Sequence, residues 1–373
     1  MKSYRIIRLS AAMLALLGMS TSVSAVTFGA FSDVRVESST QQGESTHFKL
    51  GGFDLYANQK ISDSTSAFVE TVFEDGGSGF GLDVERLFIK RKFNPLFSIA
   101  AGRFHAPLGY WNRHYHHGVL LQDTPDRPQF LEFEDGDGAI MPMHAIGLMA
   151  TGDAVSRAGT FSYEFNIANS SFLNTRDSAN ASTPGSGLEI GIGDVNDFSD
   201  SKNYFLRASF KPRVLPVEVS LFGASIRYLE SAGVGDANFG SLSMGSVLVK
   251  QTVTGLDMHY DQHPFDATAE FFHLKDDSKV GNGSDSATAF YVQLGWQFMS
   301  NLKAVYRIEQ LDANPNKDTY FQILNTPNYV HHVVGLRYDL DDSNALMFQV
   351  KQVNVQGSKN YNVFTLDWAF LMI

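Results

Sequence analysis

Three histidines lie close together in the segment NRHYHHG at 112–118. They are His114, His116 and His117, and six acidic residues follow between Asp123 and Asp137. Imidazole nitrogens bind transition metals and exchange protons near neutral pH, and carboxylates can serve as their partners. The segment therefore raises two chemical hypotheses, a metal site and an acid–base pair. Which one applies depends on the elements that position these side chains.

The dominant period along the chain is two residues. In the segment FSYEFNIA, Phe161, Phe165 and Ile167 fall on one face, and Glu164 and Asn166 fall on the other. This pattern is typical of a strand with one apolar and one wet face. Sixteen segments of this kind begin near residues 26, 46, 65, 82, 96, 143, 159, 203, 217, 247, 265, 286, 302, 329, 344 and 360.

The connections between these segments alternate in length. ISDST, NP, KPRVLP, DQHP, MSN and DDS are short, whereas 105–142, 170–202, 229–246 and 312–328 are long. An even number of strands joined alternately by short turns and long loops is typical of bacterial outer-membrane barrels. We therefore predict an all-β fold, a transmembrane antiparallel β-barrel of 16 strands. A soluble sandwich or propeller is the alternative, which the long, aromatic strands and the lack of a repeat disfavour.

The first 25 residues have the pattern of a signal peptide, with three basic residues, an apolar run and the small-residue site Val23-Ser24-Ala25. We expect export to the outer membrane of a Gram-negative bacterium, and residues 26–373 as a single barrel domain. Removing three of the 29 basic residues leaves 26 against 40 acidic ones, a net charge of −14. This balance argues against nucleic-acid binding. The chain has no cysteine, which excludes thiol chemistry and attached c-type haem.

A barrel of sixteen strands leaves an aqueous lumen unless something fills it. The segment 105–142 is the longest without a strand pattern, and it would be the third extracellular loop. The first strand directly follows the signal and the last runs to the end of the sequence, so we expect this loop to fold into the lumen as a constriction. Its charged and polar candidates are Arg113, His116, Arg127, Glu132, Glu134, Asp135 and Asp137.

The segment GRFHAPLGYW at 102–111 resembles the G-[RK]-F-x-x-P-[FL]-G element of bacterial phosphate-selective porins and their relatives. The resemblance implies a porin, a homotrimer in outer-membrane lipid, and a ladder of basic side chains in the lumen. The period-two pattern directs eight basic residues inward: Lys60, Arg86, Lys90, Arg207, Lys303, Arg307, Arg337 and Lys351. It also directs nine acidic residues inward: Asp54, Glu70, Glu74, Glu164, Glu218, Asp266, Glu270, Glu309 and Asp367. The lumen is therefore mixed in charge, and phosphate specificity does not carry over.

The histidines at 114–117 are interpreted as polar surface that packs at the barrel mouth, because neighbouring residues point in opposite directions and no third ligand has a diagnostic spacing. We expect no metal and no cofactor. The segment EFEDGDG at 132–138 lacks EF-hand spacing. It is interpreted as the acidic side of the constriction, facing wall residues such as Arg86 or Arg207, with a loose divalent-cation site as the alternative.

The sequence thus predicts an outer-membrane porin, a water-filled channel for passive diffusion of small hydrophilic solutes or ions. The charged lumen residues and the third loop would set its selectivity. Two alternatives stay open. One is a barrel sleeve for a partner such as an electron-transfer cytochrome, and the other is an outer-membrane enzyme. The enzyme is disfavoured because G-x-S-x-G is absent and no nucleophile–base pair can be named.

Overall fold

The structure is a computed structural model in which the described residues are 26–75, 80–116, 118–132, 134, 138–175, 188–192, 199–230, 243–281 and 283–372. The predicted signal segment, 1–25, lies outside them. The first seven strands are β1 (Thr27–Ser39), β2 (His47–Lys60), β3 (Thr65–Asp75), β4 (Phe80–Asn94), β5 (Phe97–His105), β6 (His144–Val155) and β7 (Gly159–Asn169). The short strands β8 (Ser171–Thr175) and β9 (Leu188–Ile192) follow. The remaining strands are β10 (Lys202–Pro212), β11 (Val217–Glu230), β12 (Val247–Gln262), β13 (Phe265–Ser278), β14 (Ser286–Met299), β15 (Leu302–Asp312), β16 (Tyr329–Asp341), β17 (Asn344–Val355) and β18 (Tyr361–Met372).

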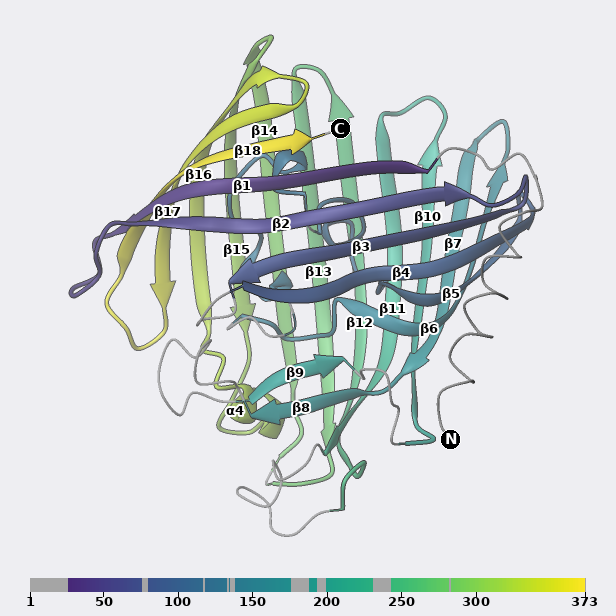
Figure 1. The fold of residues 1–373 in the computed structure, drawn as a ribbon. Helices are drawn as coiled ribbons and strands as arrows, with labels where there is room; N and C mark the ends of the chain where they lie inside the picture. Colours follow the sequence, from purple (N-terminus) through teal and green to yellow (C-terminus); the bar gives the residue numbers. More distant parts are fainter. Residues whose placement is uncertain are drawn as a thin grey trace, which may run out of the picture.

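Sixteen of these strands form a closed antiparallel barrel (Figure 1). Each pairs with its neighbour in the chain, β7 pairs with β10, and β18 returns to pair with β1 from Ala30↔Met372 to Ser39↔Val363. The remaining two, β8 and β9, form a hairpin whose β8 pairs in parallel with the end of β11. The predicted count of sixteen barrel strands is confirmed, whereas the hairpin within 170–202 was not predicted. Closure gives every strand two hydrogen-bonding neighbours, which a membrane requires.

The connections at the two ends of the barrel differ in length, as predicted. Turns such as 95–96, 263–264 and 342–343 lie at one end, and 106–143 and 313–328 lie at the other. The longer segments contain the described helices α2 (Trp111–His114), η2 (Val119–Leu121), η3 (Gln129–Leu131) and α4 (Thr319–Leu324). Among the described residues, no helix is long and apolar enough to cross a membrane.

The outer wall of the barrel is apolar. Leu221, Trp296 and Phe161 are 68, 52 and 46% exposed, and each belongs to the outward phase of its strand. The intervening positions point inward and are mostly polar or charged, for example Glu164 between Tyr163 and Phe165. The predicted alternation is therefore confirmed. An apolar outside around a polar inside is the pattern of a barrel that spans a bilayer.

Candidate functional site

The described residues of the loop 106–143 contact the inner wall of the barrel at several points along the loop. It leaves β5, forms α2, η2 and η3, and returns to β6. Its polar partners come from β1, β7 and β13–β17, so it touches strands on opposite sides of the barrel (Figure 1).

One side of the loop packs against the wall through apolar side chains. Trp111 meets the Tyr291 ring edge-on at a centroid distance of 5.7 Å, and Phe130 meets Phe272 at 5.3 Å. The loop side chains of this core that are 0–1% exposed are Ala106, Leu108, Trp111, Phe130, Leu131, Ile140, Met141 and Met143. Because apolar burial of this kind is worth about 1.5–3 kcal/mol for each large side chain, the loop is held against the wall of β11–β14.

A buried arginine on β15 anchors the middle of the loop. Arg307 donates from Nη1 to Thr124 Oγ1 at 2.7 Å and to the carbonyl oxygen of Asp126 at 3.0 Å. Its Nε donates to Glu309 Oε2 at 3.0 Å, and both of these side chains are fully buried. A planar guanidinium with five N–H donors can satisfy several loop oxygens and one carboxylate together.

Two further basic residues hold the preceding turn of the loop. Arg337 on β16 donates to the carbonyl oxygens of Leu120, at 2.6 Å, and of Gln122. Lys303 on β15 lies 2.8 Å from Asp123 and 2.7 Å from Asp266, so it bridges the loop to β13. These contacts follow the loop along one strip of the wall.

An acidic residue on β13 fixes the start of the loop. Glu270 Oε1 accepts the backbone N–H of Trp111 at 2.6 Å and the hydroxyl of Tyr291 at 2.6 Å. Gly109 has a φ of +77°, and a Cβ built there would lie 1.8 Å from Glu270 Oε2. Only glycine accommodates both this backbone conformation and this close approach.

On the opposite side, the loop meets a charged cluster on β1 and β18. Arg35 lies 3.0 Å from Asp33, 3.1 Å from Asp367 and 3.6 Å from the loop carboxylate of Asp126. Burial disfavours the ionised form of Asp126, but nearby basic side chains, Lys351 and Arg35 foremost, hold its pKa below the usual value. Burial raises the pKa of Glu132, an effect that Arg127 and Lys351 only partly offset.

A cavity of about 260 Å³ lies between this side of the loop and the inner faces of β1–β3. Its charged lining consists of Asp33, Arg35, Lys49, Asp54, Glu74, Asp126, Arg127 and Glu132. The loop therefore divides the interior into a packed side and a side with charged, open space.

No family model matches the chain, and no curated protein matches it. Solved structures match its fold. The anion-selective porin from Comamonas acidovorans superposes with a TM-score of 0.61 at 11% identity, over 93% of this chain and 99% of that one. OprB of Pseudomonas putida superposes with a TM-score of 0.59 at 11% identity, over 98% and 97%. The outer-membrane channel DcaP of Acinetobacter baumannii gives 0.59 at 10% identity, over 93% and 97%.

The fold is that of an outer-membrane porin. Identity at this level shows the architecture alone, and it does not separate the phosphate-selective family, which the segment 102–111 resembles, from other porins.

The structure places most of the predicted basic residues on the inner wall of this porin fold. Arg207 is bound by Asp257 and Ser220, and Lys351 lies 3.7 Å from Glu309. Lys90 follows Ile89, whose side chain is 50% exposed on the outer wall, so Lys90 belongs to the inward phase of β4.

Two further predictions concern Lys60 and the wall residues that the acidic loop residues face. Lys60 shares the inward phase, but it stands at the end of β2, where its side chain is 58% exposed and pairs with Asp63 of the following turn. Among the described acidic loop residues, Asp126 lies 3.6 Å from Arg35 and Glu134 lies 3.2 Å from Nδ1 of His144. Arg86 is bound by Glu70 at 2.5 Å and Arg207 by Asp257, so the predicted pairing with Arg86 or Arg207 does not hold for these two acids. Asp135 and Asp137 lie outside the described residues.

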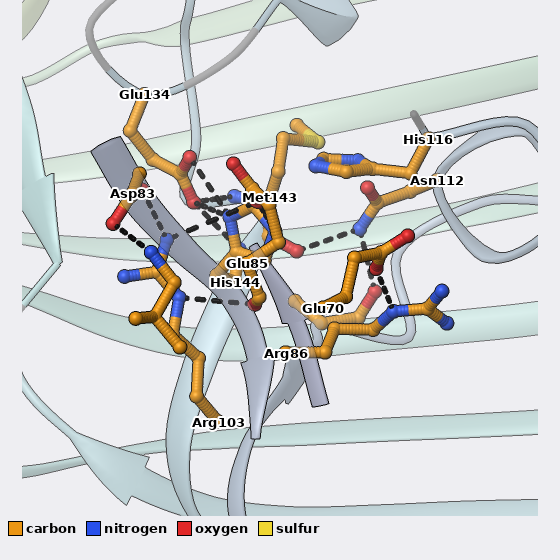
Figure 2. Close-up of polar contacts among 12 residues, drawn as sticks. Glu70, Asp83, Glu85, Arg86, Arg103, Asn112, His116, Glu134, Met143 and His144 are labelled. Carbon is orange, nitrogen blue, oxygen red and sulfur yellow. Dashed lines mark hydrogen bonds and ion pairs between the residues drawn. The ribbon is translucent and has the colours of Figure 1, made fainter. Parts of the chain in front are cut away.

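The remaining constriction-loop candidates have defined contacts. Arg113 lies 3.4 Å from Glu164 on β7, and Arg127 donates to the carbonyl oxygen of His116 at 2.7 Å. Glu134 accepts the backbone N–H groups of Met143 and His144 at 2.7 and 2.6 Å (Figure 2). The loop is thus held by its own polar groups as well as by the wall.

The histidines of 112–118 separate in the structure. The ring of His114 stacks on Tyr110 at 3.8 Å, as expected of a packing role. His116 turns toward His105 and His144 instead, and His117 lies outside the described residues. The sequence pattern could not reveal this grouping, because its three members are separated by 11 and 28 residues and meet only when the loop folds back.

Sequence reasoning also missed inward charges on the first strands. Arg35 was not predicted, although Val34 and Val36 flank it with the apolar alternation that would have identified it. Glu85 was missed for a different reason. A register shift between β3 and β4 at Glu70/Thr71 interrupts the alternation there, as a bulge does.

Proposed function

We propose that the protein is an outer-membrane channel that lets small hydrophilic solutes and ions diffuse passively. The single observation that carries this proposal is the closed sixteen-strand barrel with an apolar outer wall and a charged interior. A water-filled interior removes the cost of desolvating a polar solute, so the channel needs no cofactor. Sixteen strands are enough to leave such an interior.

The passage we propose runs between the loop 106–143 and the inner faces of β1–β3. The other side of the loop is occupied by its apolar packing against β11–β14, whereas the 260 Å³ cavity lies on the β1 side. The loop thereby acts as the constriction, and Leu120, Gln122 and Pro125 contribute to its lining on this side.

The charges of this passage favour cations over anions. Its lining includes five carboxyl groups, those of Asp33, Asp54, Glu74, Asp126 and Glu132. It includes three basic groups, those of Arg35, Lys49 and Arg127. Five carboxyl groups against three basic groups leave an excess of two acidic groups, and we therefore propose a modest cation preference. Fixed charges at a narrow point set selectivity through their arrangement.

The proposal extends to location and assembly. We propose that residues 1–25 direct export and are removed, that the barrel resides in the bacterial outer membrane, and that it forms a homotrimer. The trimer is supported by a neighbour, OmpT of Vibrio cholerae in its trimer form, which superposes with a TM-score of 0.55 at 11% identity over 93% of this chain and 100% of that one.

A sleeve around a protein partner is disfavoured by the loop itself. Such a sleeve needs a wide and empty interior, whereas Trp111, Phe130 and Ile140 are fully packed against the wall. A protein partner could pass through the barrel only if this apolar packing were lost.

Planar-bilayer recordings test the proposal. The barrel should conduct, and its reversal potential in a salt gradient should indicate a modest preference for cations. The double variant Asp126→Asn/Glu132→Gln should shift this potential toward anions. Asp63→Asn is the matched control, because Asp63 lies in an exposed turn outside the passage. Inserted protein without conductance would refute the channel, and an unchanged potential in the double variant would refute the proposed passage.

A further inference from the structure

Three imidazole rings converge where the loop meets the wall. His105 is the last residue of β5, His144 is the first residue of β6, and the two are paired across the strands. His116 approaches them from the loop. One nitrogen of each ring lies within 4.8 Å of the others, and the ring centroid of His116 is 4.3 Å from that of His105 and 4.4 Å from that of His144.

Carboxylates support this cluster from both sides of His144 (Figure 2). Glu134 lies 3.2 Å from Nδ1 of His144, and Glu85 Oε2 lies 2.8 Å from its Nε2. Glu134 is itself fixed by two backbone N–H groups. A carboxylate that accepts a hydrogen bond from one imidazole nitrogen orients the ring and strengthens the other nitrogen as a metal ligand.

We propose that His105, His116 and His144 bind a divalent transition-metal ion, and that Glu85, which now contacts Nε2 of His144, turns toward the ion as a fourth ligand. Imidazole and carboxylate ligands suit Zn²⁺. Tetrahedral Zn–N bonds of about 2.0–2.1 Å place nitrogens about 3.3 Å apart, so nitrogens that now lie within 4.8 Å of one another would close by up to about 1.5 Å on binding. When the ion binds, Glu85 would give up its contact with Nε2 of His144 and bind the ion instead.

The surrounding charge suits a cation. Besides Glu85 and Glu134, Asp83 lies nearby, where it accepts a hydrogen bond from Arg103 at 2.9 Å (Figure 2). The guanidinium of Arg127 also lies here, where it donates to the carbonyl oxygen of His116 and interacts with Glu85 and Glu134. Three carboxylates and two guanidinium groups leave one net negative charge, which favours a cation. His105 is partly exposed, whereas His116 and His144 are buried, so the ion has an approach from the His105 side.

The ion would tie the loop to the barrel, because two of the histidines belong to wall strands and one to the loop. A loop fixed in this way would change the conductance of the channel, and this effect rests on the proposed function. The binding itself does not depend on channel activity.

Zinc binding by the purified full barrel in detergent tests the site. Titration calorimetry with ZnCl₂ should reveal about one tight site per chain, and Co²⁺ in place of zinc should give the visible absorption of a tetrahedral centre. His116→Asn and His105→Asn should each abolish the tight site, and Glu134→Gln should weaken it about 10- to 100-fold. His114→Asn is the matched control, because His114 lies in the same segment outside the cluster and should bind as the wild type does.

Circular dichroism and gel migration with and without heating establish that each variant is a folded barrel. If His116→Asn does not fold, His105→Asn provides the same test from the wall. Wild-type binding no tighter than that of the two cluster variants would overturn the proposal, as would equal weakening by His114→Asn. A barrel that binds zinc but does not conduct would overturn the proposed function and leave the metal site standing.

Discussion

Replacing Arg307 with methionine tests how the loop is held. Methionine has a similar length and no charge, so the change removes the guanidinium with little loss of volume. It removes the donor to Thr124 Oγ1 and to the carbonyl oxygen of Asp126, and it leaves Lys351, at 3.7 Å, as the remaining basic partner of the buried Glu309 carboxylate among the described residues.

Breaking a buried pair by removing one partner costs about 3–5 kcal/mol. The barrel strands keep their backbone hydrogen bonds, so we expect this cost to fall on the docked state of the loop. At about 1.4 kcal/mol for each factor of ten, the ratio of docked to undocked loop should fall by roughly 100-fold to a few thousand-fold. The apolar core opposes complete release, so the loop should open more often rather than unfold.

Single-channel recording and limited proteolysis measure this effect. Arg307→Met should give larger and noisier conductance and faster cleavage within the loop. Adding Glu309→Gln should recover part of the loss, because it removes the stranded charge. Lys60→Met is the control, since the exposed Lys60 pairs with the turn residue Asp63 at the end of β2, away from the loop. Wild-type conductance and wild-type cleavage in Arg307→Met would refute the reasoning.

Three further predictions concern the loop, the outer wall and the passage. Gly109→Ala should loosen the start of the loop, because its Cβ would meet the carboxylate of Glu270 at 1.8 Å and its φ is +77°; proteolysis should be faster there. Leu221→Arg should lower the stability of the inserted barrel by about 2–4 kcal/mol if Leu221 lies near the bilayer midplane, as measured by urea unfolding in vesicles. Acid should reduce cation preference in two steps, Glu132 first and Asp126 second, because the pKa of Glu132 is raised and that of Asp126 is lowered; reversal potentials recorded as the pH is lowered follow both steps.

Acid also changes the free energy of unfolding, and the sign of this change follows from the pKa shift of Asp126. The lowered pKa of Asp126 means that its ionised form stabilises the folded state above its ordinary pKa, and this contribution is lost as the pH falls through the folded value. Glu132→Gln should remove the first step and leave the second. A single step in the wild type, or two steps in Glu132→Gln, would contradict the assignment.

The control for the outer-wall variant is Leu221→Ala, which keeps the outer wall apolar. It should lower the stability of the inserted barrel far less than Leu221→Arg does.

The strands of the barrel were predictable because each carries its own signal. Apolar side chains at every second position, as in 161–168, must face one side of a strand whatever its neighbours are, and the sixteen starting points agree with the structure to within a few residues. The errors lie where this local rule is interrupted. A register shift hid Glu85, whereas Lys60 keeps the inward phase and pairs with Asp63 at the end of β2.

The loop was predictable in position but not in contacts. Its length and lack of a strand pattern identified 105–142 as one long connection between two strands. Which wall residue each loop group meets depends on how the connection folds back, as in the pairing of Arg307 with Thr124, 183 residues away. No spacing along the chain encodes such a pairing.

The sequence by itself determined the barrel, its strand number and which residues face inward along most strands, because side-chain alternation is a local consequence of the extended backbone. Only the tertiary structure decided the path of the loop, the shape of the remaining passage and the meeting of His105, His116 and His144. These features arise from contacts between segments far apart in the chain, where burial and charge balance select one arrangement among many that the same local pattern allows.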